Sequence, residues 1–313
     1  NYVGTSNELH GCANDVRRMI PVLAKLGFPS DSASQKVLLD EEGVSGPKPT
    51  HANMLEALDW LVAGASAGDA LLLHYSGHGG REPAQDGGYH ETLVPLDFES
   101  AGMLRDTELF ERLVRRLPEG CRLTCILDSC HSAGALNLPY IFVGTEAELR
   151  KAVAGEAVRM ALSMRWKSDL EKWSQGSSKE LFGDVSSMGK NLWKMYQDGQ
   201  SGFVTDQEQT RGIAVGEVVA ITGCRSDQTS ADVGDVSTFG IEGVSGSAGG
   251  ALTSALVEAL EGAESLTYAD LLERMRRELA AKGFSQVPQF VSSLLVELKQ
   301  PFKLDSIFVE DKQ

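Results

Sequence analysis

The sequence is short of positive charge and of long apolar runs. Lys and Arg number 29 against 44 Asp and Glu, which gives a formal net charge of −15. Non-specific nucleic-acid binding needs a basic surface, so no nucleic-acid partner is expected. No apolar run approaches the roughly 20 residues that span a bilayer, so no membrane partner is expected either. The acidic balance mildly favours cationic ligands, although most of these charges are expected to be ordinary solvated surface.

Cysteine is scarce as well, and its pattern excludes a disulfide scaffold. The five cysteines form an odd and scattered set: Cys12, Cys121, Cys125, Cys130 and Cys224. Such a set is typical of a reducing compartment, in which a free thiol survives, so a cytoplasmic location is predicted. The opening residues show no signal-peptide pattern. Cys121 and Cys125 have no second pair nearby that would complete a structural zinc site.

Residues 69–80, which read D-A-L-L-L-H-Y-S-G-H-G-G, are the stretch around which the chain is organised. Residues 70–73 are a short apolar run of the kind found in a buried parallel strand. The glycines that follow let the backbone turn sharply and let another chain approach closely. In an open α/β sheet, ligands bind at the carboxyl ends of the strands. His78 is therefore predicted to lie where chemistry takes place.

A second stretch has the same form. Residues 122–127 (R-L-T-C-I-L) predict a strand, and D-S-C-H-S follows from Asp128. Cys130 is thus delivered to a strand end as His78 is. Because two neighbouring parallel strands would put the thiol and the imidazole on one rim, the pair is interpreted as a cysteine–histidine hydrolytic dyad.

The composition, 42% hydrophobic and 23% charged, allows a large core, and the patterns alternate between helix and strand. Helices are predicted over residues 12–26, 51–63, 106–117, 249–260 and 267–282. Strands are predicted over residues 34–39, 70–73, 89–95, 122–127, 215–222 and 290–298. This order predicts an α/β fold with a mainly parallel central sheet and helices on both faces.

The chain is predicted to form one domain in three regions. Residues 1–144 contain both motifs, and residues 211–313 resume the sheet pattern. Between them, residues 145–210 have helical patches and no strand pattern, and they are interpreted as an insertion. Residues 1–11 read as a polar loop that starts abruptly, as though a strand preceded it.

The two motifs, Y-S-G-H-G at Tyr75 and D-S-C-H-S at Asp128, resemble the signature motifs of the metacaspases, which are caspase-like cysteine peptidases. Further matches run along the chain: E-L-H-G-C-A-N-D-V (8–16), S-D-Q-T-S-A-D (226–232) and F-S-Q-V-P-Q-F (284–290). Their order and spacing are most similar to type I members. The resemblance implies a caspase-like sandwich fold and cysteine endopeptidase activity, and the protein is expected to be a monomer.

The dyad assigns roles to particular groups. A free thiol has a pKa near 8.5 and needs a base or a polar setting to ionise, and His78 is suited to this task. Cys130 is predicted to attack a peptide carbonyl, and His78 to protonate the leaving amine. The backbone N–H groups of Gly79 and Cys130 are the candidate oxyanion donors, as the resemblance also implies.

The resemblance also implies a pocket for the substrate residue before the scissile bond, lined by Cys12, Asp15, Ser76 and Asp128. Two carboxylates in a narrow pocket favour Arg, and also Lys, over Asp. Taken alone, Asp15 is equally explained as a first-turn charge that interacts with the dipole of its helix.

Many metacaspases need calcium, and here the sequence departs from the family. At the positions that match the family's calcium ligands stand His90, Asp106, Thr107 and Asn137. Only Asp106 keeps a carboxylate, whereas calcium takes six to eight oxygen ligands and gains affinity from their charge. We therefore expect a calcium cofactor to bind only weakly, unless nearby acids supply the missing oxygen ligands. The candidate acids are Asp86, Glu91, Asp97 and Glu99.

Two other functions are considered. The loss of calcium residues favours a non-catalytic caspase-like binding or protein-quality-control module, whereas the intact His78 and Cys130 oppose it. A caspase-fold peptidase with Asn or Asp specificity is opposed by Asp15 and Asp128.

Overall fold

The computed structural model describes these residues: 1–41, 43–84, 89–130, 134–142, 203–205, 214–223, 232–233, 249–261, 265–284, 286–294, 296, 298 and 300–304. The helices are α1 (Cys12–Lys25), α2 (His51–Val62), α3 (Phe98–Ala101), α4 (Asp106–Leu109), the π-helical turn η1 (Phe110–Val114), α8 (Ala251–Leu260) and α9 (Tyr268–Ala281). The strands are β1 (Ala70–Ser76), β2 (Gly79–Pro83), β3 (Tyr89–Leu93), β4 (Leu104–Arg105), β5 (Arg122–Asp128), β6 (Tyr140–Phe142), β7 (Phe203–Thr205), β8 (Glu217–Thr222), β9 (Asp232–Val233), β10 (Gly249–Gly250) and β11 (Gln289–Ser292). None of the helices in this described part has the length and apolar character needed to cross a bilayer.

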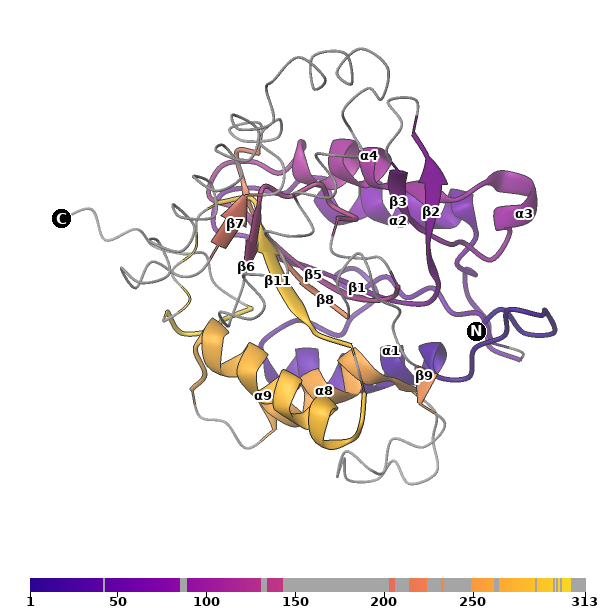
Figure 1. Cartoon of the computed structure of the whole chain (residues 1–313). Coiled ribbons are helices and arrows are strands. Elements are labelled where there is room, and N and C mark those ends of the chain that lie inside the picture. The colour runs from indigo at the N-terminus through magenta and orange to yellow at the C-terminus, as the bar shows by residue number, and fades with distance from the viewer. Residues whose placement is uncertain are drawn as a thin grey trace, which may run out of the picture.

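The central sheet has six strands in the order β1-β5-β8-β11-β6-β7 (Figure 1). β1, β5 and β8 are parallel, and they include both strands that precede the two motifs. β11, β6 and β7 complete the sheet with antiparallel pairings. The predicted α/β fold is confirmed, and the antiparallel pairings are confined to the side of the sheet away from the motifs.

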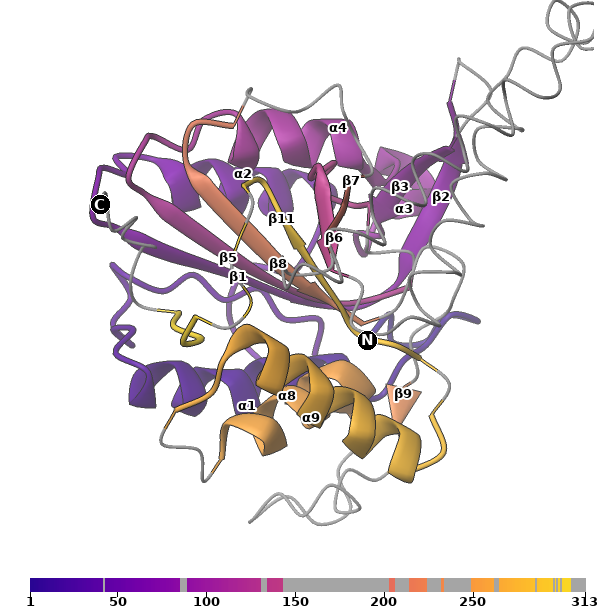
Figure 2. The ribbon, with the colours of Figure 1, turned by 60° about the vertical axis from the view of Figure 1, so that its left-hand side comes forward.

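Helices cover both faces of this sheet, as the two views show (Figures 1 and 2). α1, α8 and α9 lie on one face, and α2, α4 and η1 lie on the other. The alternation of side chains along β5 explains the two layers: Ile126 packs in the apolar cluster under α1, α8 and α9, whereas Cys125 and Leu127 pack in the cluster under α2 and η1. Every residue of β5 is buried, as expected for a strand that is covered on both faces.

The helices predicted at α2 and α9 agree with the structure to within about one residue, because both begin at capping residues. The Thr50 side chain accepts a hydrogen bond from the Asn53 N–H at the start of α2. Thr267 and Asp270 form a reciprocal capping box at the start of α9. Local side-chain chemistry therefore fixes both starts.

Some sequence predictions are wrong. Residues 34–39 form no strand, because no described strand pairs with their backbone; an apolar run such as V-L-L favours a strand but does not supply a partner. β1 is only partly buried, because it lies at the edge of the described sheet rather than at its centre. The helix predicted over 106–117 is α-helical only to Leu109 and continues as η1.

The part of the insertion that the structure describes also differs from the prediction. β7, at residues 203–205, is a strand within the segment that was expected to contain none, and it pairs with β6. The helical patches predicted between 146 and 173 lie outside the described residues.

A second sheet of three short antiparallel strands, β2-β3-β4, follows the His78 loop directly. Only β3 was anticipated, as the strand predicted over 89–95.

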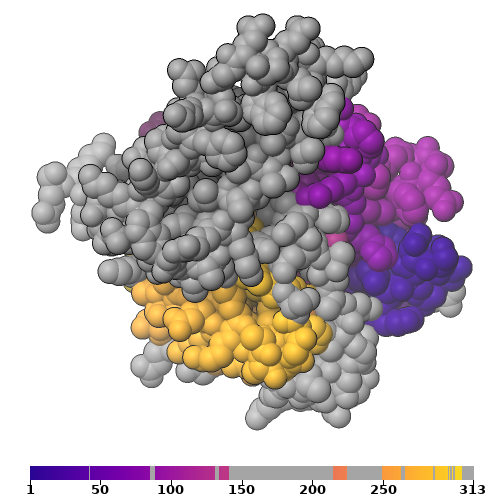
Figure 3. All heavy atoms as spheres, in the orientation of Figure 1, coloured from indigo at the N-terminus to yellow at the C-terminus, as the bar shows by residue number. Residues whose placement is uncertain are grey.

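In the orientation of Figure 1, the visible described surface is formed by the C-terminal helices below and the N-terminal half at the right (Figure 3).

Candidate active site

The register between β1 and β5 sets the position of both motifs. Ser76, the last residue of β1, pairs with Asp128, the last residue of β5. His78 and Cys130 each follow these partners by two residues. The Gly77 N–H donates a 3.3 Å hydrogen bond to the Asp128 carbonyl, which extends the pairing past the strand ends. The two loops therefore leave the sheet side by side.

The loops touch at Gly79. A Cβ added at Gly79 would lie 1.8 Å from the carbonyl oxygen of Cys130 and 3.3 Å from its backbone nitrogen. Any larger residue would push the two loops apart. Gly79 thus allows the His78 loop to lie against the Cys130 backbone, and it brings together the two residues predicted to supply oxyanion donors.

His78 is held by three groups that sequence reasoning missed. Its backbone N–H donates to the Tyr2 hydroxyl at 3.0 Å, and its carbonyl accepts from the Tyr75 hydroxyl at 2.8 Å. Nε2 of the His78 ring lies 2.7 Å from the Asn7 carbonyl oxygen. Because a carbonyl only accepts, we assign the proton of the neutral ring to Nε2, which leaves the lone pair on Nδ1.

The two tyrosines are rigid neutral supports. Burial raises the pKa of Tyr2 to about 12, partly offset by its hydrogen bond with Tyr75. Burial also raises the pKa of Tyr75. The ring of Tyr2 lies 4.7 Å from that of His78, centroid to centroid. The one signal in the sequence is an aromatic residue inside an otherwise polar opening segment.

Cys130 differs from the other described cysteines in its exposure. Cys12, Cys121 and Cys125 are buried, whereas Cys130 is partly exposed. Burial raises the pKa of the Cys125 thiol, so this sulfur is a poor nucleophile. Among the described cysteines, Cys130 is therefore the one that substrate can reach most readily.

Asp15 and Asp128 lie together behind the loops, at the start of α8. Asp15 accepts hydrogen bonds from the Ser76 hydroxyl at 2.6 Å and from the Gly250 N–H at 2.8 Å. Asp128 accepts from the Thr253 N–H at 2.8 Å. A Cβ added at Gly250 would lie 2.1 Å from an Asp128 carboxylate oxygen and 2.8 Å from one of Asp15. Both carboxylates thus face the same glycine.

The Asp15 carboxylate also contacts a cation and a second carboxylate. Arg18 makes an ion pair with Asp15 and is the cation that sequence reasoning missed. Burial raises the pKa of Asp15 to about 7, and the neighbouring Asp128 charge adds to the rise, while Arg18 opposes it. Asp15 is fully buried and Asp128 is 4% exposed, so substrate access depends on the chain around Gly250.

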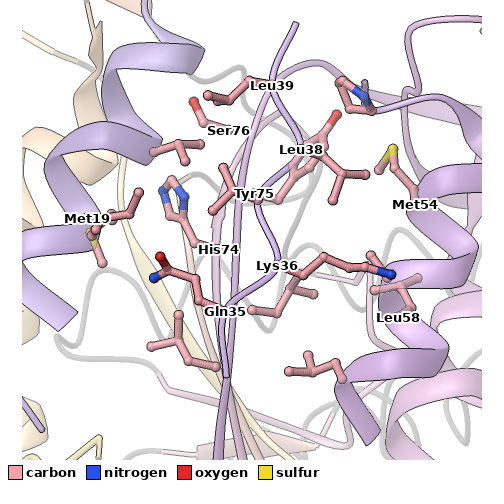
Figure 4. Close-up of a pocket in the computed structure, with 18 of the residues that line it drawn as sticks. Met19, Gln35, Lys36, Leu38, Leu39, Met54, Leu58, His74, Tyr75 and Ser76 are labelled. Atoms are coloured by element: carbon pink, nitrogen blue, oxygen red, sulfur yellow. The ribbon is translucent and has the colours of Figure 1, made fainter. Parts of the chain in front are cut away.

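The structure divides the four predicted pocket residues between two places. Cys12 and Ser76 line a cavity of about 540 Å³ that lies between α1, α2 and β1, and neither Asp15 nor Asp128 lines it. Figure 4 shows Met19 on one side of this cavity and Met54 on the other, with residues of β1 between them. A hydrogen bond from the Ser76 hydroxyl to Asp15 joins the two places.

The residues at the expected calcium positions do not fit a calcium ion. His90 Nδ1 lies 2.8 Å from Asp106 Oδ1, which also accepts from the Thr107 N–H at 2.6 Å. The Glu91 N–H donates to Asp106 Oδ2 at 3.3 Å, so both oxygens of Asp106 have partners within the protein. Among the described residues, no three acidic, His or Cys side chains are grouped so that they could hold a metal ion.

The nearby acids named as substitutes are placed differently. Asp97 accepts a hydrogen bond from the His51 N–H at the start of α2. Glu99 is exposed on α3, and Glu91 pairs with Arg81. Asp86 lies outside the described residues. The described acids thus form no oxygen-rich cage around Asp106.

The sheet, the helix layers and the two loops define the class: a caspase-like fold with a histidine and a cysteine at adjacent strand ends. A solved crystal structure of a Geobacter sulfurreducens protein shares this fold with a TM-score of 0.53 and 19% identity, over 98% of this chain and 94% of its own. A family model described as "Metacaspase, peptidase C14 domain" matches residues 1–139.

Two curated relatives match almost the whole chain. Metacaspase-1 of Mycosarcoma maydis is 38% identical over 99% of this chain and 71% of its own length. Metacaspase-3 of Trypanosoma cruzi is 35% identical over 99% of this chain and 74% of its own length. The chain belongs to the metacaspase family, and with it to the cysteine peptidases of the C14 family. The resemblance predicted from the motifs is confirmed.

Proposed function

We propose that the protein is an endopeptidase that cleaves after Arg or Lys with Cys130 as nucleophile and His78 as its base. The observation that carries the proposal is the contact between the two loops: the Gly79 backbone lies against that of Cys130, directly after the register pair Ser76 and Asp128. A partly exposed thiol and an oriented imidazole on one rim are what nucleophilic catalysis requires.

The chemistry follows from the assigned tautomer. His78 Nδ1 takes the thiol proton of Cys130, and the thiolate attacks the carbonyl carbon of the scissile bond. The Asn7 carbonyl favours the imidazolium that forms, because it accepts the Nε2 hydrogen throughout. Backbone N–H groups of Gly79 and Cys130 stabilise the oxyanion.

The remaining steps restore the enzyme. The C–N bond breaks, the amine leaves with the proton from His78, and a thioester remains on Cys130. A water molecule then gives a proton to His78 and attacks the thioester. The carboxylic acid product leaves, and Cys130 recovers its proton.

The preference for Arg or Lys rests on charge. Asp15 and Asp128 lie close enough for the Asp128 charge to raise the pKa of Asp15, and a cationic substrate side chain would relieve this repulsion. Arg suits such a pair because its planar guanidinium forms bidentate hydrogen bonds, and Lys binds as a point charge. A substrate Asp would add a third negative charge and be rejected.

One feature favours the alternative, a non-catalytic binding module. Each of the two carboxylates already accepts a backbone hydrogen bond at the start of α8, as purely structural anchors would. The orientation of His78 by Asn7 favours the catalytic function, since a binding module has no need of a fixed imidazole.

A thiol-reactive peptide inhibitor separates the two functions. An inhibitor that ends in arginine should label Cys130 faster than the same inhibitor ending in aspartate, and the Cys130→Ala variant should take no label and show no turnover. Peptide mapping by mass spectrometry identifies the labelled residue. Equal labelling by both inhibitors, or turnover by the Ala variant, would reject the proposal.

A further inference from the structure

A carboxylate on β3 holds the chain beyond the nucleophile. Glu91 is 8% exposed and accepts a 2.6 Å hydrogen bond at Oε2 from the backbone N–H of Gly134. Gly134 is the first described residue after Cys130. A Cβ added at Gly134 would lie 2.8 Å from the same oxygen, so a larger residue would displace the carboxylate. The contact therefore needs both the acid and the glycine.

The charge of Glu91 is balanced from the neighbouring strand. Arg81 on β2 is the register partner of Glu91, and its guanidinium nitrogen lies 3.3 Å from Glu91 Oε1. One oxygen of the carboxylate thus meets a cation and the other a backbone amide. Because a buried carboxylate is costly without such partners, Arg81 makes the position of Glu91 stable.

A second pair lies beside the first. His90, the next residue on β3, contacts Asp106 at the start of α4 with 2.8 Å between Nδ1 and Oδ1. Where the family resemblance sets carboxylates around a metal, this chain sets a basic side chain against each acid. A divalent cation would find its two nearest carboxylates already occupied.

We propose that Glu91, balanced by Arg81, is a positioning residue that anchors Gly134, four residues after Cys130, and makes calcium unnecessary. Glu91 touches no reacting atom; it acts through Gly134, while Gly79 lies directly against the Cys130 backbone. The inference rests on the proposed role of Cys130 as nucleophile.

Substitutions on two neighbouring ion pairs test the positioning role. Glu91→Ala should lower kcat about 10- to 100-fold with KM nearly unchanged, since a misplacement of about 1 Å is enough for such a loss. Glu91→Gln should recover most of kcat, because its amide oxygen still accepts from Gly134. The control is Glu82→Gln, which breaks the Glu82–Arg105 pair on the same sheet without touching the loop. An unchanged kcat in Glu91→Ala, or an equal loss in the control, would overturn the role.

Alkylation of Cys130 by iodoacetamide gives a readout that does not need peptidase activity. The rate, followed by mass spectrometry, should change in Glu91→Ala and stay at the wild-type value in Glu82→Gln. If the protein cleaves no peptide yet shows this dependence, the proposed function fails and the positioning role stands. If it cleaves Arg peptides and the rate ignores Glu91, the positioning role fails alone.

The metal requirement is tested on the wild-type protein. Its Tm and kcat should be the same with a chelator and with millimolar calcium. A His90→Asp, Thr107→Asp double variant, which puts carboxylates at positions that match the family's calcium ligands, should gain a calcium-dependent rise in Tm. A calcium-dependent rise in the Tm or kcat of the wild-type protein would overturn the inference.

Discussion

Two pairs of carboxylates near the catalytic loops differ in how their charge is balanced. Asp15 makes an ion pair with Arg18, yet its pKa rises to about 7 because burial and the neighbouring Asp128 carboxylate oppose its charge. Glu91 and Asp106 each contact a basic side chain of their own, Arg81 and His90. Both pairs are largely buried, so burial does not distinguish them.

This difference indicates which of the two acidic pairs gains more from binding a cation. Two carboxylates that repel each other gain energy when a positive group enters, whereas Glu91 and Asp106 would have to give up existing contacts. We therefore propose substrate recognition for the Asp15–Asp128 pair and a structural role for the Glu91–Asp106 pair. Substitutions at each acidic pair, and at one exposed ion pair as a control, test this division.

The largest effect is expected at Asp128. Asp128→Asn should lower kcat/KM for Arg-ending peptides about 100-fold or more, because it removes one charge from a buried, hydrogen-bonded ion pair with the substrate. Steady-state kinetics with Arg- and Gln-ending peptides measures the change. The Gln-ending peptide should lose far less; an equal loss on both would mean that Asp128 supports only the fold.

A smaller effect is expected where the loop meets Glu91. Gly134→Ala should lower kcat about tenfold, because the new methyl group displaces the Glu91 carboxylate and shifts the loop. Combining it with Glu91→Ala should add little, since both changes break the same contact. Fully additive losses in this double-mutant cycle would contradict a shared mechanism.

The next effect in size is a pH dependence of KM that comes from Asp15. Its carboxyl is mostly protonated at pH 6 and mostly ionised at pH 8, because its pKa is about 7. KM for Arg peptides should therefore fall as the pH rises through 7, and this fall should be absent in Asp15→Asn. Comparing the two profiles removes the contributions of His78 and Cys130, which both proteins share.

The Asp15 carboxyl should also make stability depend on pH, but here a rise in pH is unfavourable. The pKa of Asp15 is higher in the folded than in the unfolded protein, so its contribution to stability is full below about pH 4 and is lost as the pH rises to about 7. Urea unfolding of the wild type against Asp15→Asn measures this difference. A stability difference that grows in favour of the wild type over this range would contradict the assignment.

The smallest effect is expected for the exposed pair formed by Glu82 and Arg105. Glu82→Gln should leave kcat, KM and Tm unchanged within error, because solvent screens such pairs. A clear loss would show that the β2–β3 hairpin as a whole, rather than the Glu91 contact, supports the loop.

Sequence patterns predicted the parts of the site that depend on local order. Short apolar runs followed by the Y-S-G-H-G and D-S-C-H-S motifs placed His78 and Cys130 after parallel strands, and β1 and β5 are indeed parallel neighbours. Capping residues fixed the starts of α2 and α9. These features involve neighbours along the chain, and the chain order therefore carries them.

The groups that were missed act across the chain. Tyr2 and Asn7 meet His78 from more than 70 residues away, and Glu91 meets Gly134 across 43 residues. No local pattern indicates such contacts. The strand wrongly predicted at 34–39 shows the same limit, because pairing depends on a partner that the segment itself does not specify.

The most direct test of the account is the ratio of kcat/KM for two peptides that differ only in Arg or Asp before the scissile bond. Asp15 and Asp128 predict that the Arg peptide is preferred at least about 100-fold, because a like charge in the pocket costs several kcal/mol, and that Cys130→Ala cleaves neither peptide. Preference for Asp would contradict the acidic pocket, and turnover by Cys130→Ala would contradict the assigned nucleophile.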